Sequence, residues 1–159
     1  MTATPHFLFA SDSLKGTLSS VEAARLLGEA AHRHFPGCVC EVVPMADGGE
    51  GTAAALVGAC GGELRRACVS DPLGRPVEAA YALLPDGRAV VEMAAASGLP
   101  LLSPGERNPL LTSTFGTGEL VRAALDAGAR DVTMALGGSA TNDGGLGMAR
   151  ALGVRLLDA

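Results

Sequence analysis

The chain has 159 residues, enough for about one ordinary domain, and its 48% hydrophobic and 18% charged residues exclude a disordered polypeptide. The net charge of −5, with no basic cluster beyond Arg65-Arg66, argues against nucleic acid as a partner. The N-terminus lacks a basic segment followed by an apolar one, and no apolar run reaches membrane-spanning length. We therefore expect a cytoplasmic protein with no membrane partner.

The first predicted elements are a buried strand over residues 7–10 and an amphipathic helix over residues 20–34. The helix is preceded by Ser19-x-x-Glu22, a capping box in which the serine and the glutamate each bind a backbone N–H at the start of the helix. The segment between strand and helix, residues 11–17, contains Lys15, the only lysine among twelve Lys and Arg residues. Because a lysine is a compact point charge, its single use in such a loop suggests an anionic ligand, although a solvated surface lysine is the alternative.

A second unit of the same kind follows. Residues 39–43 predict a strand, and the next helix is expected to run to about residue 59, with Asp47-x-x-Glu50 resembling its cap. Two successive strand–loop–helix units predict a parallel sheet with right-handed crossover connections.

Between residues 63 and 102 the pattern changes to short strands separated by turn sequences at 71–76 and 85–87. This spacing is typical of hairpins, and we interpret the region as an insertion or the beginning of a second domain. The crossover pattern then returns, with the expected elements being a helix over residues 119–127, a strand over 131–136, a helix ending at 152 and a strand over 154–157.

The four cysteines do not follow a common zinc-binding pattern. Cys38-x-Cys40 has a one-residue gap and no second pair completes a site, so we expect reduced thiols. His32 and His34 are two residues apart on the expected helix and point to different faces, which makes a metal site formed by the two histidines improbable.

Three strand-to-helix loops, residues 11–17, 44–52 and 137–145, are expected at one edge of the parallel sheet, where ligands bind. Their carboxylates, lysine and glycines suit phosphoryl transfer, because lysine neutralises phosphate charge and a carboxylate can hold Mg²⁺ or accept a hydroxyl proton. Helix caps and ordinary turns are the alternative for each loop taken singly. The known phosphate-loop and dinucleotide fingerprints are absent. Arg107 is a candidate carboxylate clamp and Ser97 a weak ligand candidate.

Six segments in order resemble the bacterial type I glycerate kinases: residues 11–16, 44–52, 92–99, 107–109, 116–119 and 137–145. The resemblance extends over essentially the whole chain. It implies ATP-dependent, Mg²⁺-dependent phosphorylation of D-glycerate in a cleft between a flavodoxin-like domain and a second α/β domain. Leu14 stands where the family usually has phenylalanine, and the chain is less than half as long as a typical member.

The resemblance also implies roles for the loop residues. The expected catalytic residues are Lys15, Asp12, Asp47 and Asp143, with Asp47 and Asp143 also the expected metal ligands. The expected substrate-binding residues are Ser13, Ser97 and Arg107. Nucleotide is expected to contact Gly48, Gly49, Gly137, Gly138, Ser139, Thr141, Asn142 and Gly144.

The expected fold class is α/β, with a flavodoxin-like or Rossmann-like parallel sheet and part of an inserted second α/β domain. Residues 1–63 and 112–151 are assigned to the first domain, and 64–111 and 152–159 to the second. The alternative function is a non-catalytic nucleotide-binding or anion-binding module, and a dehydrogenase is disfavoured by the missing fingerprint. We expect the 159-residue chain alone to be a poor kinase with a tendency to form homo-oligomers. Which glycerate oxygen accepts the phosphoryl group stays open.

Overall fold

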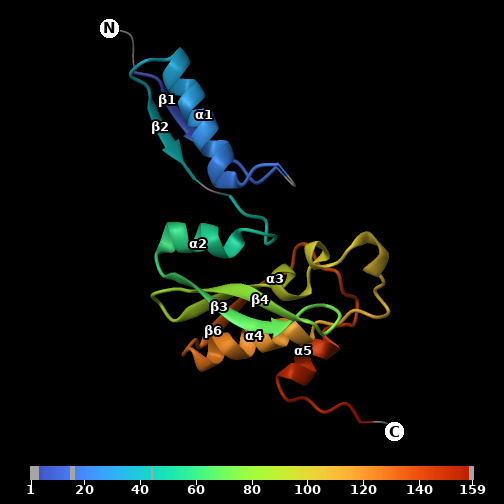
Figure 1. Cartoon of the computed structure of the whole chain (residues 1–159). Helices are drawn as coiled ribbons and strands as arrows, with labels where there is room; N and C mark the ends of the chain where they lie inside the picture. Colours follow the sequence, from blue (N-terminus) through green and yellow to red (C-terminus); the bar gives the residue numbers. More distant parts are fainter. Residues whose placement is uncertain (1–3, 15–16, 44, 158–159) are drawn as a thin grey trace. The chain divides into compact units, whose positions relative to one another are not determined.

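The computed structural model describes residues 4–14, 17–43 and 45–157. It divides into two compact units, residues 1–47 and residues 48–159. Each unit is an arrangement of helices and strands, so the expected α/β class is confirmed (Figure 1). No helix among the described residues is long and apolar enough to cross a membrane.

The first unit is one strand–helix–strand element. Strand β1 (His6–Phe9) pairs in parallel with β2 (Val39–Val42), and helix α1 (Ser20–His34) connects them. The capping box is present: the Ser19 Oγ accepts from the Glu22 N–H at 3.2 Å, and the Glu22 carboxylate accepts from the Ser19 N–H at 3.0 Å. The predicted strand, crossover helix and capping box are therefore confirmed for this unit.

Few side chains in the first unit are buried. Among its described residues, the buried hydrophobic ones are three alanines and one cysteine: Ala23, Ala24, Ala31 and Cys38. Many large apolar side chains are exposed in the described residues, among them Leu8 at 63% and Val21 at 60%. The unit therefore has little core of its own, and small units of this kind are only marginally stable without additional cross-links.

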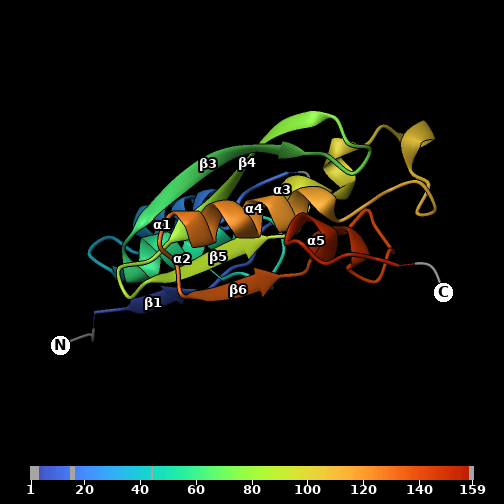
Figure 2. The ribbon, with the colours of Figure 1, turned by 90° about the horizontal axis from the view of Figure 1, so that it is seen from below.

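The second unit is built on a four-stranded sheet in the order β3-β4-β5-β6. Its first two strand pairs are antiparallel, which confirms the predicted hairpins, and β5 and β6 are parallel (Figure 2). The strands are β3 (Glu63–Ser70), β4 (Pro76–Leu83), β5 (Arg88–Glu92) and β6 (Asp131–Ala135). The helices are α2 (Thr52–Cys60), α3 (Ala94–Ser97), α4 (Phe115–Asp126), α5 (Leu146–Ala151) and the short 3₁₀ turns η1 (Leu99–Leu101) and η2 (Pro104–Glu106).

Helices cover both faces of this sheet, as Figure 1 shows for α2 on one side and α4 on the other. Alternate residues of each strand therefore enter different cores. Tyr81 and Val91 pack with Leu120 of α4, whereas Ala82 and Val90 pack with Ala53 of α2. This explains why β5 is an apolar run without polar alternation.

Helix α4 approaches its neighbours so closely that two of its first residues must be glycine. A Cβ added at Gly116 would lie 1.7 Å from the carbonyl oxygen of Ser70, and one at Gly118 would lie 2.4 Å from the carbonyl oxygen of Met148. The Glu119 carboxylate accepts from the Ser70 N–H at 2.7 Å, which fixes the same contact. The segment 116–119 thus packs α4 between the end of β3 and α5.

The structure differs from the sequence-based expectations at several boundaries. Strand β6 pairs with β5, and residues 112–151 lie in the same compact unit as the hairpins of 64–111. Helix α4 begins at Phe115, four residues earlier than expected. The strand expected over 154–157 is wrong, because these residues form no strand.

The expected cap of α2 is also wrong. The N-cap is Gly51 in a left-handed conformation, without a side-chain hydrogen bond to the helix. Instead the carboxylate of Glu92, at the end of β5, accepts from the Ala53 N–H at 2.7 Å. A residue distant in sequence therefore supplies the acceptor that Asp47-x-x-Glu50 was expected to provide.

Candidate functional site

In the first unit, the loops that follow β1 and β2 lie at the same edge. The Val43 N–H donates to the carbonyl of Phe9 at 2.9 Å, and the Met45 N–H donates to that of Ser11 at 3.3 Å, so the two segments stay side by side beyond the strands. Asp12 and Asp47 follow directly and are exposed. This is the arrangement expected for the carboxyl ends of parallel strands.

Asp12 is held locally, since its carboxylate accepts from the N–H of Ser13 at 2.7 Å. A pocket of about 340 Å³ opens beside it, lined by Ser11, Asp12, Leu14, Leu18, Ala23, Leu26 and Leu27. Lys15, the expected phosphate-binding cation, and its neighbour Gly16 lie outside the described residues.

In the second unit, a pocket of about 280 Å³ lies at the carboxyl ends of the parallel strands β5 and β6. Its lining combines methionines with hydroxyl, amide and carboxylate groups and glycines. The lining residues are Met93, Thr114, Thr117, Met134, Leu136, Thr141, Asn142, Asp143, Gly144, Gly145 and Met148. Three of the expected nucleotide-contacting residues, Thr141, Asn142 and Gly144, are therefore brought to one cavity.

The glycine-rich loop 137–145 is fastened to the segment that precedes α2. The Gly137 N–H donates to the carbonyl of Gly48 at 2.8 Å, and a Cβ at Gly137 would lie 2.6 Å from the Cα of Gly49. On its other side, the loop carbonyl of Gly138 accepts from the Leu99 N–H at 3.0 Å. The second and third loops thus meet, and Gly137 serves loop-to-loop packing. The expectation of one parallel sheet was wrong, because the strands that precede these loops, β2 and β6, belong to different sheets.

Asp143 is the organising residue of this edge. One carboxylate oxygen, Oδ2, accepts from the backbone N–H groups of Thr114 at 2.8 Å and Gly147 at 3.1 Å, and Oδ1 accepts from that of Gly145 at 3.1 Å. The hydroxyls of Thr114 and Ser113 also contact Oδ2, at 2.9 and 3.3 Å. These donors fix the orientation of the Asp143 carboxylate, which also lines the pocket.

The pKa of Asp143 reflects this network. Partial burial by itself raises the pKa, but the bonds from the Thr114 N–H and hydroxyl and from the Gly147 and Gly145 N–H groups together hold it below its ordinary value. The charged form is therefore stabilised, and it joins the first residues of α4 to those of α5.

The other expected site residues have mixed surroundings. Ser97 is fully buried, and its hydroxyl lies 2.7 Å from that of Thr117, whose side chain lines the pocket. Ser139 bonds locally to Thr141 at 3.2 Å in a turn. Arg107 is exposed, directly after η2.

Sequence reasoning missed three residues that shape the edge: Glu92, Thr114 and Thr117. Glu92 could have been suspected, because it is a carboxylate that ends an otherwise apolar strand. Thr114, 3% exposed, accepts from the Met148 N–H at 2.9 Å while donating to Asp143. No local sequence pattern distinguishes this threonine or Thr117 from other buried threonines.

Comparison with known proteins gives consistent matches. Residues 7–159 match the profile of the glycerate kinase family. A glycerate kinase of Bacillus subtilis is 53% identical over 95% of this chain, and a glycerate 2-kinase of Escherichia coli is 47% identical over 96%. A crystal structure described as glycerate kinase 2 of Salmonella typhimurium LT2 covers 98% of the chain with a TM-score of 0.82 and 46% identity. The chain spans 40% of the length of these curated relatives and 42% of the solved chain.

Proposed function

The chain belongs to the glycerate kinase family, and we propose that the protein carrying it transfers the γ-phosphoryl group of ATP to D-glycerate. The observation that carries the proposal is the family match over residues 7–159, together with relatives near half identity that are named glycerate kinases. One relative is named a glycerate 2-kinase, which favours the 2-hydroxyl as the acceptor.

The geometry at the carboxyl ends of the parallel strands supports the proposed phosphoryl transfer in both units. The pocket at the ends of β5 and β6 is bordered by the loop 137–145, where Gly144 and Gly145 have positive φ and an added Cβ would meet no atom closer than 3.9 Å. Such glycines let a phosphate or a base approach the backbone. We propose that this pocket, with Thr141 and Asn142 in its wall, contacts the nucleotide.

The expected metal ligands were Asp47 and Asp143, and the surroundings of Asp47 and Asp12 suit Mg²⁺. Asp12 and Asp47 are exposed carboxylates at one edge of the first unit, and carboxylate oxygens are the ligands this hard cation prefers. We assign them as candidates for the metal ligand and the base. When bound, the ion would neutralise charge on the transferring phosphoryl group.

Lys15 retains its proposed role of neutralising phosphate charge, and Arg107 and Ser13 are retained as candidates for contacts to the glycerate carboxylate or hydroxyls. Charge neutralisation acts on the charge that develops in the transition state, so its loss should lower turnover more than substrate affinity. Asp143 holds the edge together by fixing the first residues of α4 and α5.

The test is an ADP-release assay on the protein carrying this chain, with D-glycerate, L-glycerate or no acceptor. ADP formation that requires both D-glycerate and Mg²⁺ is the expected result, with the product position read by ³¹P NMR. Acceptor-independent ATP hydrolysis, or nucleotide binding without turnover, would instead identify a non-catalytic nucleotide-binding module.

The residue-level test is Lys15→Met, with Arg33→Met, an exposed cation on α1, as the matched control. Loss of one phosphate-directed charge should lower turnover on the order of 100-fold or more. The control should leave turnover unchanged. Equal activity in the two variants would assign Lys15 to the solvated surface.

A further inference from the structure

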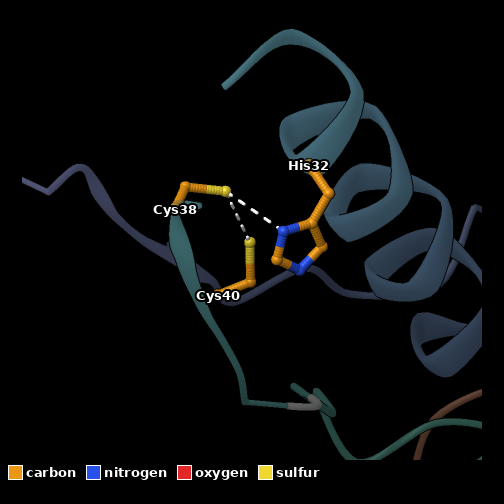
Figure 3. A group of neighbouring side chains, drawn as sticks. All are labelled: His32, Cys38 and Cys40. Carbon is orange, nitrogen blue, oxygen red and sulfur yellow. Dashed lines mark hydrogen bonds between the residues drawn. The ribbon is translucent and has the colours of Figure 1, made fainter. Parts of the chain in front are cut away.

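Three soft ligand atoms gather at the end of the first unit opposite the loops that follow the strands. They are the Nδ1 of His32, in the last turn of α1, and the Sγ atoms of Cys38 and Cys40, at the start of β2 (Figure 3). All lie within 4.8 Å of one another. We propose that this cluster binds a thiophilic metal ion of the Zn²⁺ type, a site that does not depend on the kinase activity proposed above.

The local fold explains why the three atoms converge. Residues two apart in an extended strand point to the same face, so the one-residue gap of Cys38-x-Cys40 places both thiols on the side of β2 that faces α1. The short connection over residues 35–37 keeps the last turn of α1 next to these two thiols. The side chain of His32, which lies in that turn, therefore reaches them. The spacing that argued against zinc in the sequence is thus compatible with it in a helix–turn–strand.

Two of the three pairwise distances agree with tetrahedral coordination. Zn–S and Zn–N bonds of about 2.3 and 2.05 Å at tetrahedral angles place two sulfurs about 3.8 Å apart and a sulfur and a nitrogen about 3.5 Å apart. The observed separations are 3.6 Å between the Cys38 and Cys40 sulfurs and 3.4 Å between the Cys38 Sγ and the His32 Nδ1. The sulfurs are too far apart for a disulfide bond, and both cysteines are free.

The three ligand residues differ in exposure, as expected for a metal site that an ion can enter. Cys38 is buried at 6% exposure, Cys40 is partly buried and His32 is exposed. An ion can therefore enter from the histidine side and complete its shell there with water, because these residues supply three of four tetrahedral ligands. Two thiolates and an imidazole select Zn²⁺ or Cu⁺ over Mg²⁺.

The position suggests a structural role. The cluster joins the last turn of α1 to β2. Asp12 lies beyond the other end of α1, eight residues before the helix begins. The two ends of this 15-residue helix are about 20 Å apart. In the part of the first unit that the structure describes, the buried hydrophobic residues are alanines and Cys38. A metal ligated across α1 and β2 would stabilise a unit with so little core.

The test titrates the reduced 159-residue chain with Zn²⁺ against a chromophoric chelator, and with Co²⁺ as a spectroscopic probe. About one equivalent should bind tightly, with a thiolate-to-cobalt charge-transfer band and tetrahedral d–d bands. His32→Gln and Cys40→Ser should each weaken binding at least about tenfold. His34→Gln and Cys60→Ser, whose side chains are outside the cluster, are the matched controls and should not.

Thiol labelling provides a readout that needs no variant. Zn²⁺ should slow the alkylation of Cys38 and Cys40 and leave the alkylation rates of the exposed Cys60 and Cys68 unchanged.

The His32→Gln substitution changes an exposed residue, and circular dichroism checks that the variant is folded. Binding of less than one equivalent, equal loss in the controls, uniform labelling protection, or a Cys38–Cys40 disulfide that persists under the reducing conditions would each overturn the proposal.

Discussion

Replacing Gly116 by alanine tests the packing of α4 against the sheet most directly. The new Cβ would lie 1.7 Å from the carbonyl oxygen of Ser70, so one of the two segments must move by more than about 1 Å. Ser70 cannot easily move, because it ends β3 and pairs with Pro76 in β4. The helix start must therefore shift away from the core that surrounds Leu120.

The magnitude follows from two opposing effects. Overpacking of this kind costs about 3 kcal/mol at the upper end of its usual range. Alanine in place of glycine in a helix returns about 1 kcal/mol. The net loss for Gly116→Ala is therefore about 2 kcal/mol, which for an ordinary denaturant dependence lowers the urea midpoint of the second unit by roughly 1 M.

Gly58→Ala is the matched control. Gly58 lies in α2 of the same unit, and an added Cβ would meet no atom within 4 Å. This variant should gain up to about 1 kcal/mol from helix propensity. The two glycines thus differ in surroundings but not in the type of substitution.

The assay is urea unfolding followed by the fluorescence of Tyr81. It is the only tyrosine of a chain without tryptophan, and it is 4% exposed in the second unit, so it reports on this unit and not on the first. A midpoint for Gly116→Ala that equals or exceeds that of Gly58→Ala would refute the close approach of α4 to Ser70.

Three further predictions concern the site. Asp143→Asn should lower the unfolding free energy of the second unit by about 2–4 kcal/mol in urea unfolding. The amide NH₂ cannot accept from the N–H groups that face the carboxylate of Asp143. Equal stability of the variant and the unchanged chain would contradict this. The pKa of Asp143 in the folded chain is lowered from 3.8, so its ionised carboxylate contributes its full stabilisation above that pH. This contribution is lost as the pH falls through the folded pKa. In urea titrations below about pH 4, the Asp143→Asn variant should therefore lose less stability than the unchanged chain. Asp47→Asn should lower turnover of the protein carrying this chain at saturating Mg²⁺, and unchanged kinetics would remove Asp47 from the metal and base candidates. Ser97→Ala and Thr117→Val should each cost about 1–3 kcal/mol in urea unfolding, and the double variant less than their sum, since both hydroxyls belong to one 2.7 Å contact; strict additivity would argue against that contact.

Local sequence patterns determined much of this protein. The helix over residues 20–34 with its Ser19-x-x-Glu22 box, the parallel pairing of the first two strands and the hairpins of the second unit follow from residue periodicity, turn residues and short connections. The family relationship likewise follows from the order of the glycine-rich loops. These features depend on residues close together in the chain, where spacing alone fixes which side chains meet.

Only the tertiary structure decided the features that depend on distant residues. Glu92 replaces Asp47-x-x-Glu50 as the acceptor at the start of α2, and Asp143 accepts from the backbone N–H of Thr114, 29 residues away. Even between His32 and Cys38, six residues apart, the contact depends on how the folded chain turns from α1 into β2. The sequence shows that a carboxylate or a thiol is present, but not which groups surround it. Its role is set by the donors and ligands that the folded chain places around it.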